Sequence, residues 1–135
     1  MNIKNLFLFN GRINRKKYIF YQLVFPILIL PLSFYNPDNI FLILIKTCLN
    51  LSIAIILVSK SVQRLHDMNF SGVVVLIPLI LGFLGNFLDS LIFPMIVLGY
   101  YIHLMIKKGT IGPNKYGDDP LGPTKQTNTF INEAE

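Results

Sequence analysis

Residues 18–35 read YIFYQLVFPILILPLSFY and contain no charged side chain. A helix rises about 1.5 Å per residue, so a run of this length roughly matches the ~30 Å hydrocarbon core of a bilayer when its tyrosine ends are included. Pro26 and Pro31 should kink this helix, which membranes tolerate because neighbouring groups satisfy the freed carbonyls. The stretch therefore predicts a first membrane-spanning helix, Tyr18–Tyr35.

The rest of the chain shares this apolar character. Hydrophobic residues make up 53% of the 135 residues and charged residues only 14%, with a mean hydropathy of +0.55. A soluble domain of this size has too much surface to hide so many apolar side chains. The composition predicts an all-α membrane protein, with residues 1–122 as a single transmembrane domain and residues 123–135 as a disordered tail.

Further apolar segments follow the first. Asn36–Asn39 has a turn composition, Ile40–Ser59 is the second predicted span, and Lys60–Gly72 is predicted to be a polar connection. Val73–Ile106 is too long for one helix of ordinary length. The middle of this stretch is unfavourable for a continuous apolar helix, because small, polar and helix-breaking residues cluster there: Gly82, Gly85, Asn86, Asp89, Ser90 and Pro94. We therefore divide it into a third span, Val73–Leu88, and a fourth, Leu91–Ile106.

The positions of the basic residues set the orientation. With four spans, every lysine and arginine outside the spans falls on one side, which the positive-inside bias assigns to the cytoplasm together with both termini. The alternative has three spans, with one long tilted helix in place of the last two. It would place Lys107, Lys108, Lys115 and Lys125 outside. Met1–Lys17 mixes apolar and basic side chains and is predicted to be an interfacial segment.

The net charge of +5 does not indicate a nucleic-acid partner. The basic residues lie at the ends of apolar runs, and no solvated stripe of lysine and arginine with interleaved aromatics is present. This placement favours membrane lipids with anionic headgroups as partners. Two ionisable residues lie within apolar stretches: Lys46, expected to reach outward to the interface, and Asp89, expected in a wet turn.

Three polar segments interrupt the apolar pattern, and the four-span model brings them together at the inner face. They are residues 9–18, residues 63–67 and residues 112–120. We expect Arg12, Arg15 and Arg64 to reach Asp67, Asp118 and Asp119, because arginine favours paired contacts with carboxylates. The candidate cluster comprises Gly11, Arg12, Arg15, Arg64, His66, Asp67, Asn114, Tyr116, Gly117 and Asp119. Two interpretations are open: a structural staple of helix ends, or a binding site for an anionic headgroup or a small anion.

Other chemistry is weakly supported. His66 and His103 are too few and too far apart in sequence for a zinc site, which needs three or four ligands. We therefore predict no metal, cofactor or catalytic residue. The leading functional hypothesis is a non-enzymatic accessory or lipid-contacting membrane protein. The alternatives are a small transporter or channel, oligomeric and using Lys46 or Asp89, and a membrane enzyme using His66 and Asp67.

The three polar segments also resemble a known family, the bacterial inner-membrane family called domain of unknown function 805. Its pattern opens with F-x-G-R-x-x-R-x-x-Y, continues with R-L-H-D and closes with N-x-Y-G-x-D-P. Here these motifs are Phe9–Tyr18, Arg64–Asp67 and Asn114–Pro120, within a match from Leu6 to Gly122. The resemblance implies a multi-spanning protein of the bacterial inner membrane and implies no activity. The chain departs from the pattern in having no tryptophan, since Ile19 and Val73–Val74 stand where the family often has it.

Overall fold

The structure, a computed structural model, describes residues 6–122, and within this range the fold is all-α. The helices are α1 (Arg15–Phe34), α2 (Ile40–Asp67), α3 (Leu76–Phe87) and α4 (Ile92–Ile106), with a 3-10 turn, η2 (Gly72–Val75), leading into α3. The predicted tail, residues 123–135, and the first five residues of the predicted interfacial segment lie outside the described residues.

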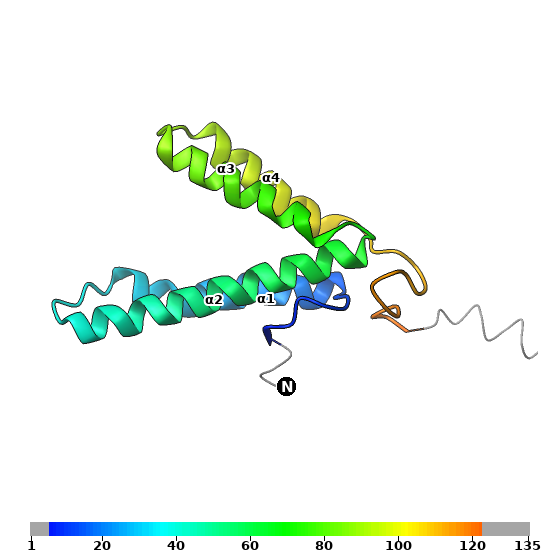
Figure 1. The fold of residues 1–135 in the computed structure, drawn as a ribbon, viewed down its shortest axis with the longest axis horizontal. Helices are drawn as coiled ribbons and strands as arrows, with labels where there is room; N and C mark the ends of the chain where they lie inside the picture. Colours follow the sequence, from blue (N-terminus) through cyan, green and yellow to red (C-terminus); the bar gives the residue numbers. More distant parts are fainter. Residues whose placement is uncertain (1–5, 123–135) are drawn as a thin grey trace, which may run out of the picture.

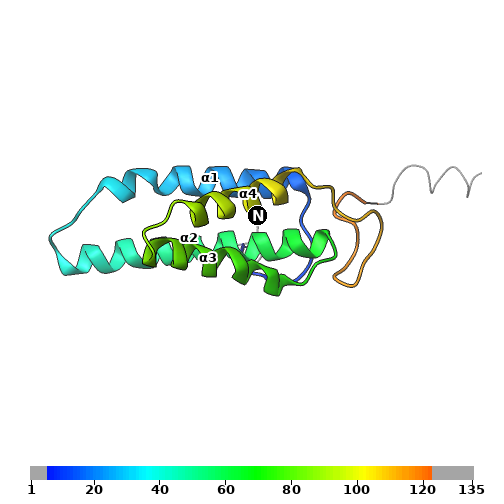
Figure 2. The same cartoon turned by 90° about the horizontal axis from the view of Figure 1, so that it is seen from above.

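The helices form two hairpins that meet at one end and diverge at the other (Figure 1). One hairpin is α1 and α2, and the other is α3 and α4 (Figure 2). The two hairpins meet where α2 and α4 end, beside the loop that follows α4. We call this region the junction. The opposite ends of the hairpins carry the short connections 35–39 and 88–91.

Local sequence explains where the first hairpin begins and turns. Asn14 caps α1 by accepting a hydrogen bond from the Lys17 N–H at 3.0 Å, and Asn39 caps α2 by accepting from the Phe41 N–H at 2.8 Å. Such caps satisfy backbone donors that a helix start leaves free. α1 continues through Pro26 and Pro31, so the first apolar run forms a single helix as predicted.

One predicted boundary is wrong. Residues from Lys60 onward were expected to form a polar connection, but α2 continues to Asp67. Lysine, glutamine and arginine are good helix formers, so the loss of hydrophobicity after Ser59 does not end the helix. Its last two turns carry polar side chains that are buried against the junction. The connection between the hairpins is therefore short, from Met68 to Ser71.

The division of the last apolar stretch is confirmed. α3 ends at Phe87 and α4 begins at Ile92, and Asp89 lies in the turn between them with φ +47. Of the described helices, α2 alone is long and apolar enough to cross a membrane by length and composition, while α3 with η2, and α4, are shorter. The described chain thus has four helices, and α2 supports its association with a membrane.

The core lies at the junction and contains polar as well as apolar side chains. Ile13, Tyr18, Val62, Leu65, Met68, Val75 and Leu104 form its hydrophobic cluster. Residues 59–67 of α2 and the residue that follows, Met68, are all buried. Large apolar side chains elsewhere are exposed, among them Phe34 at 80% and Leu91 at 83%. Polar side chains are thus buried and large apolar side chains exposed, the reverse of the usual arrangement in water. This pattern suits helices that face hydrocarbon, because a water-facing protein rarely leaves such large apolar areas uncovered.

Candidate functional site

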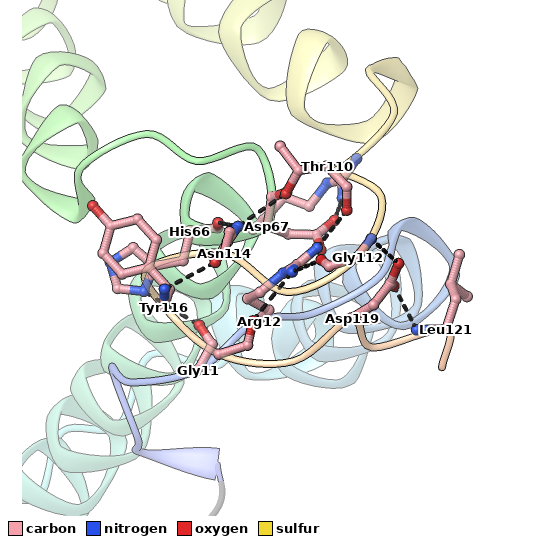
Figure 3. A network of polar contacts seen from close by, with 12 residues as sticks. Gly11, Arg12, His66, Asp67, Thr110, Gly112, Asn114, Tyr116, Asp119 and Leu121 are labelled. Atoms are coloured by element: carbon pink, nitrogen blue, oxygen red, sulfur yellow. Dashed lines mark hydrogen bonds and ion pairs between the residues drawn. The ribbon is translucent and has the colours of Figure 1, made fainter. Parts of the chain in front are cut away.

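The three polar segments predicted to converge do meet at the junction (Figure 3). Arg12 comes from the segment before α1, His66 and Asp67 from the last turn of α2, and Asn114 to Asp119 from the loop after α4. We call the group Arg12, Arg64 and Asp67 the clamp, because it joins these segments.

Arg12 is the centre of the clamp, and 1% of its side chain is exposed. Its Nε donates to Asp67 Oδ1 at 3.1 Å. Its two terminal nitrogens donate to three carbonyls of the C-terminal loop, those of Thr110 at 2.5 Å, Gly112 at 2.6 Å and Gly117 at 3.2 Å. One guanidinium therefore ties the N-terminal segment to both α2 and the loop.

Arg64 makes the matching connection to α4, and its side chain is fully buried. Its Nε donates to the Leu104 carbonyl at 2.9 Å. Its terminal nitrogens donate to the Asp67 carboxylate, one turn along α2, and to the Lys107 carbonyl. The free carbonyls at the end of α4 are thus capped by a cation, the favourable partner for a helix C-terminus.

Asp67 receives both arginines, one on each carboxylate oxygen. It lies beyond the predicted span Ile40–Ser59. Burial raises the pKa of Asp67 above its ordinary value, while the hydrogen bond from Arg12 and the charge of Arg64 oppose this shift. Its backbone carbonyl accepts from the Thr110 N–H at 2.8 Å and hydroxyl at 2.9 Å. A methyl group at Gly109 would collide with the carboxylate, so this position needs glycine.

His66 lies against the loop on the other side of the α2 terminus. Its ring stacks on Tyr116 with centroids 3.8 Å apart and an interplanar angle of 7°, and its Nδ1 lies 3.2 Å from the Gly11 carbonyl. Asn114 donates to the His66 backbone carbonyl at 2.9 Å. Burial lowers the pKa of His66, and the charge of Lys115 adds to this, although the Gly11 carbonyl opposes it. The ring is therefore neutral at pH 7 and donates through Nδ1.

The C-terminal loop is held in shape by its own polar side chains. Asn114 and Gly117 exchange two backbone hydrogen bonds of 3.0 Å each. Asp119 accepts from the backbone N–H groups of Leu121 and Gly112, at 2.9 Å each, and these bonds lower the pKa of Asp119. Gly112 and Gly117 have φ values of +77 and +129, which favour glycine. The loop therefore presents its carbonyls to Arg12 in a fixed arrangement.

Some predicted contacts are not made. Arg15 is exposed and donates to the Ile106 carbonyl at 3.1 Å, not to a carboxylate. Asp118 is exposed and forms no ion pair with the described residues. Asp119 bonds backbone N–H groups and no arginine side chain. Of the expected contacts between arginines and carboxylates, the described residues make those of Arg12 and Arg64 with Asp67. Asp118 and Asp119 receive none, because the loop directs its carbonyls, not its acidic side chains, to Arg12.

Two predicted residues lie away from the junction. Lys46 donates to the Tyr35 carbonyl at 2.6 Å, so its ammonium lies beside the connection between α1 and α2. Asp89 lies in the turn between α3 and α4. Within residues 6–122, no three histidine, cysteine, aspartate or glutamate side chains are grouped in a way that could hold a metal ion.

Two further residues complete the junction: Ser59, which the sequence reasoning missed, and Gln63, which it placed in a polar segment but not in the candidate cluster. Gln63 donates to the carbonyls of Leu8 at 2.7 Å and Asn10 at 3.0 Å, and Ser59 donates to the Leu8 carbonyl at 2.5 Å. Ser59, Gln63 and Asp67 recur every four residues, which places them on one face of a helix. That spacing was visible in the sequence, but the prediction of a loop after Ser59 concealed it.

A pH dependence follows from the neutral state of His66. The folded protein holds this ring with a lowered pKa, so the unfolded chain binds the proton more readily below pH 6.5, the ordinary value. Stability is fully present above that value and falls as the pH decreases through it toward the pKa of the folded state. We expect the melting temperature in mild detergent to fall between pH 7.5 and 5.5.

A His66→Gln variant separates the effect of His66 from that of Asp67. The raised pKa of Asp67 favours the folded state as the pH decreases, which is opposite to the effect of His66. A His66→Gln protein should lose part of the decrease in melting temperature, while His103→Gln should retain it. Equal pH profiles for the wild type and His66→Gln would contradict the neutral, buried ring.

The arrangement is a network of hydrogen bonds and ion pairs made within the protein itself. The guanidinium groups of Arg12 and Arg64 direct their donors at protein carbonyls and at one carboxylate. Buried arginines with satisfied donors commonly fix structure, and removing one partner leaves an uncompensated charge. The clamp is therefore suited to holding three segments in register.

Comparison with known proteins agrees with the motifs. Residues 6–118 match the model of a family described as "Protein of unknown function (DUF805)". No curated protein and no solved structure gives a significant match. The matched region contains the segment before α1, all four helices and most of the C-terminal loop. The chain therefore belongs to the DUF805 family.

Proposed function

We propose that this chain is a non-enzymatic, multi-spanning protein of the bacterial inner membrane, in which the clamp fixes two helical hairpins at the cytoplasmic surface. The observation that carries the proposal is that every side-chain nitrogen of the two buried arginines bonds to the protein itself. Arg12 and Arg64 donate hydrogen bonds to the Asp67 carboxylate and to backbone carbonyls of the loop and of the end of α4. A catalytic or transport role would need polar groups available to a substrate.

The placement in a bilayer is supported by the distribution of charge. α2 has 28 residues, which at about 1.5 Å each gives roughly 42 Å, enough to cross the hydrocarbon core and extend beyond it. Its last turns, with Arg64, are in the junction. The exposed basic residues Arg15, Lys16, Lys17, Lys107, Lys108 and Lys115 also lie in segments that adjoin the junction. The positive-inside bias then assigns the junction to the cytoplasm.

The second hairpin is too short for an ordinary span. α3 has 12 residues and α4 has 15, so they extend roughly 18 and 22 Å. Such a hairpin either crosses a locally thinned bilayer or enters from the cytoplasmic side and returns. In both cases the chain returns to the cytoplasm after α4, which keeps the C-terminal loop on the same side as Arg12.

Cysteine labelling tests the topology. In a Cys48→Ser background, we expect Lys115→Cys to react only after the inner membrane is opened, and Asp38→Cys to react with an impermeant maleimide in intact spheroplasts. A third variant, Asp89→Cys, reports on the second hairpin: labelling from outside indicates a crossing, and protection indicates a re-entrant hairpin. External labelling at both 38 and 115 would refute the proposed orientation.

A further inference from the structure

A pocket of about 220 Å³ lies beside the clamp. Asn14 and Arg15 line it from the start of α1, and residues 108–111 and 119–121 line it from the loop after α4. Arg64 and Asp67 of the clamp also contribute to its lining. The pocket is therefore at the surface that the proposed orientation places against the lipid headgroups.

Two cations of this pocket retain donors for a ligand. Arg15 uses one terminal nitrogen for the Ile106 carbonyl, which leaves its other donors available. Lys108 is exposed, and its ammonium makes no hydrogen bond or ion pair with residues 6–122. The two acidic residues are already engaged, Asp67 by the arginines and Asp119 by two backbone N–H groups. With Arg12 and Arg64 close by, the surroundings carry an excess of positive charge.

The same pocket has an apolar edge, formed by two aliphatic side chains that would be unfavourably exposed if water surrounded them. Ile111 is 84% exposed and Leu121 is 77% exposed, although both belong to a polar loop outside the helices. Both residues line the pocket. Aliphatic side chains beside exposed cations are typical of segments that lie at a membrane interface, where the cations meet phosphates and the aliphatic groups meet the upper acyl region.

We infer that this pocket binds the headgroup of an anionic phospholipid. Arg15 and Lys108 contact the phosphate, and Ile111 and Leu121 contact the glycerol and the first acyl carbons. The inference rests on the proposed function for the position of the pocket at the bilayer surface. A free phosphate ion would satisfy the cations, but it would leave the two aliphatic side chains without a partner.

Lipid binding by purified full-length protein tests the inference. Native mass spectrometry in an uncharged detergent would follow the binding of short-chain phosphatidylglycerol, with phosphatidylcholine and inorganic phosphate as the comparison ligands. The test variant is Arg15→Gln/Lys108→Gln. Its matched control, Lys16→Gln/Lys115→Gln, removes two exposed charges from the same helix and the same loop but away from the pocket lining.

We expect the test variant to bind phosphatidylglycerol at least about tenfold more weakly, since each lost cation near the surface costs about 1 kcal/mol. The control should bind as the wild type does. Ile111→Ser/Leu121→Ser should weaken phosphatidylglycerol binding as well. If the double charge variant does not elute as a folded species, Lys108→Gln alone, which removes no hydrogen bond or ion pair with residues 6–122, carries the test.

Three results would overturn the inference. Equal loss of binding in the test and control variants would indicate non-specific attraction to positive charge. Displacement of phosphatidylglycerol by an equal concentration of inorganic phosphate would indicate a free phosphate site. Equal affinity for phosphatidylcholine would remove the role of the anionic headgroup. A chain that labels as membrane-spanning yet gives any of these results fails this inference alone, whereas a chain released from membranes by carbonate fails the proposed function.

Discussion

An Asp67→Ala protein is expected to lose most of its folded population in mild detergent. Asp67 is 3% exposed and is the carboxylate shared by Arg12 and Arg64, whose side chains are 1% and 0% exposed. The substitution leaves two buried guanidinium groups without a counter-charge. Breaking a buried ion pair by removing one partner typically costs about 3–5 kcal/mol, a large part of the stability of a small domain. Titration with sodium dodecyl sulfate in mixed micelles measures the loss.

The control for this prediction is Asp118→Ala. Asp118 belongs to the loop after α4 but is exposed and forms no ion pair within residues 6–122, so its removal should change the free energy of unfolding by less than about 0.5 kcal/mol. Similar unfolding curves for Asp67→Ala and the wild type would show that the clamp does not hold the fold together.

Arg12→Lys is expected to have the second-largest effect, although it conserves charge. Lysine offers one ammonium, whereas the planar guanidinium of Arg12 bonds Asp67 and three carbonyls at fixed angles. A lysine at this position can keep contact with the carboxylate but loses at least two bonds to the loop. Hydrogen bonds of charged groups contribute about 1.5–3 kcal/mol each, so we expect a loss of roughly 3 kcal/mol or more in the free energy of unfolding.

Arg15→Lys provides the comparison at an exposed arginine three residues away. Arg15 donates to a single carbonyl, and its replacement should leave the unfolding curve nearly unchanged. Limited proteolysis adds a local readout, since Arg12→Lys should expose the loop at residues 110–121 to cleavage before the helices unfold. Resistance equal to that of the wild type would mean that the loop is held by Asp67 and Asn114 without Arg12.

Much of the fold could be predicted from hydrophobicity and the positions of special residues. All but the last residue of the charge-free run Tyr18–Tyr35 lies in α1, which begins at Arg15, and Gly85, Asn86 and Asp89 correctly located the break between α3 and α4. The composition also anticipated exposed apolar helices. These features could be predicted because they depend on local chemistry, the solvent preference of a run of residues and the tendency of small and polar residues to end helices.

The end of α2 and the pairing of the clamp could not be predicted in this way. Lys60 to Asp67 is polar enough to suggest a loop, but partners from distant segments, such as the Leu8 carbonyl for Gln63, make burial of these helical turns favourable. The choice of Arg12 over Arg15 as the partner of Asp67 depends on where the chain before α1 passes. The role of the loop carbonyls depends on the positive φ values of Gly112 and Gly117.

The central claim, that the clamp fixes the two hairpins relative to each other, is tested most directly by the distance between their far ends. Spin labels at two exposed positions, Phe41→Cys in α2 and Leu88→Cys after α3, in a Cys48→Ser background and in nanodiscs, give that distance by double electron–electron resonance. We predict one narrow distribution for the otherwise native protein and a clearly broader one when Arg12→Lys is added. Identical distributions in the two proteins would contradict the claim.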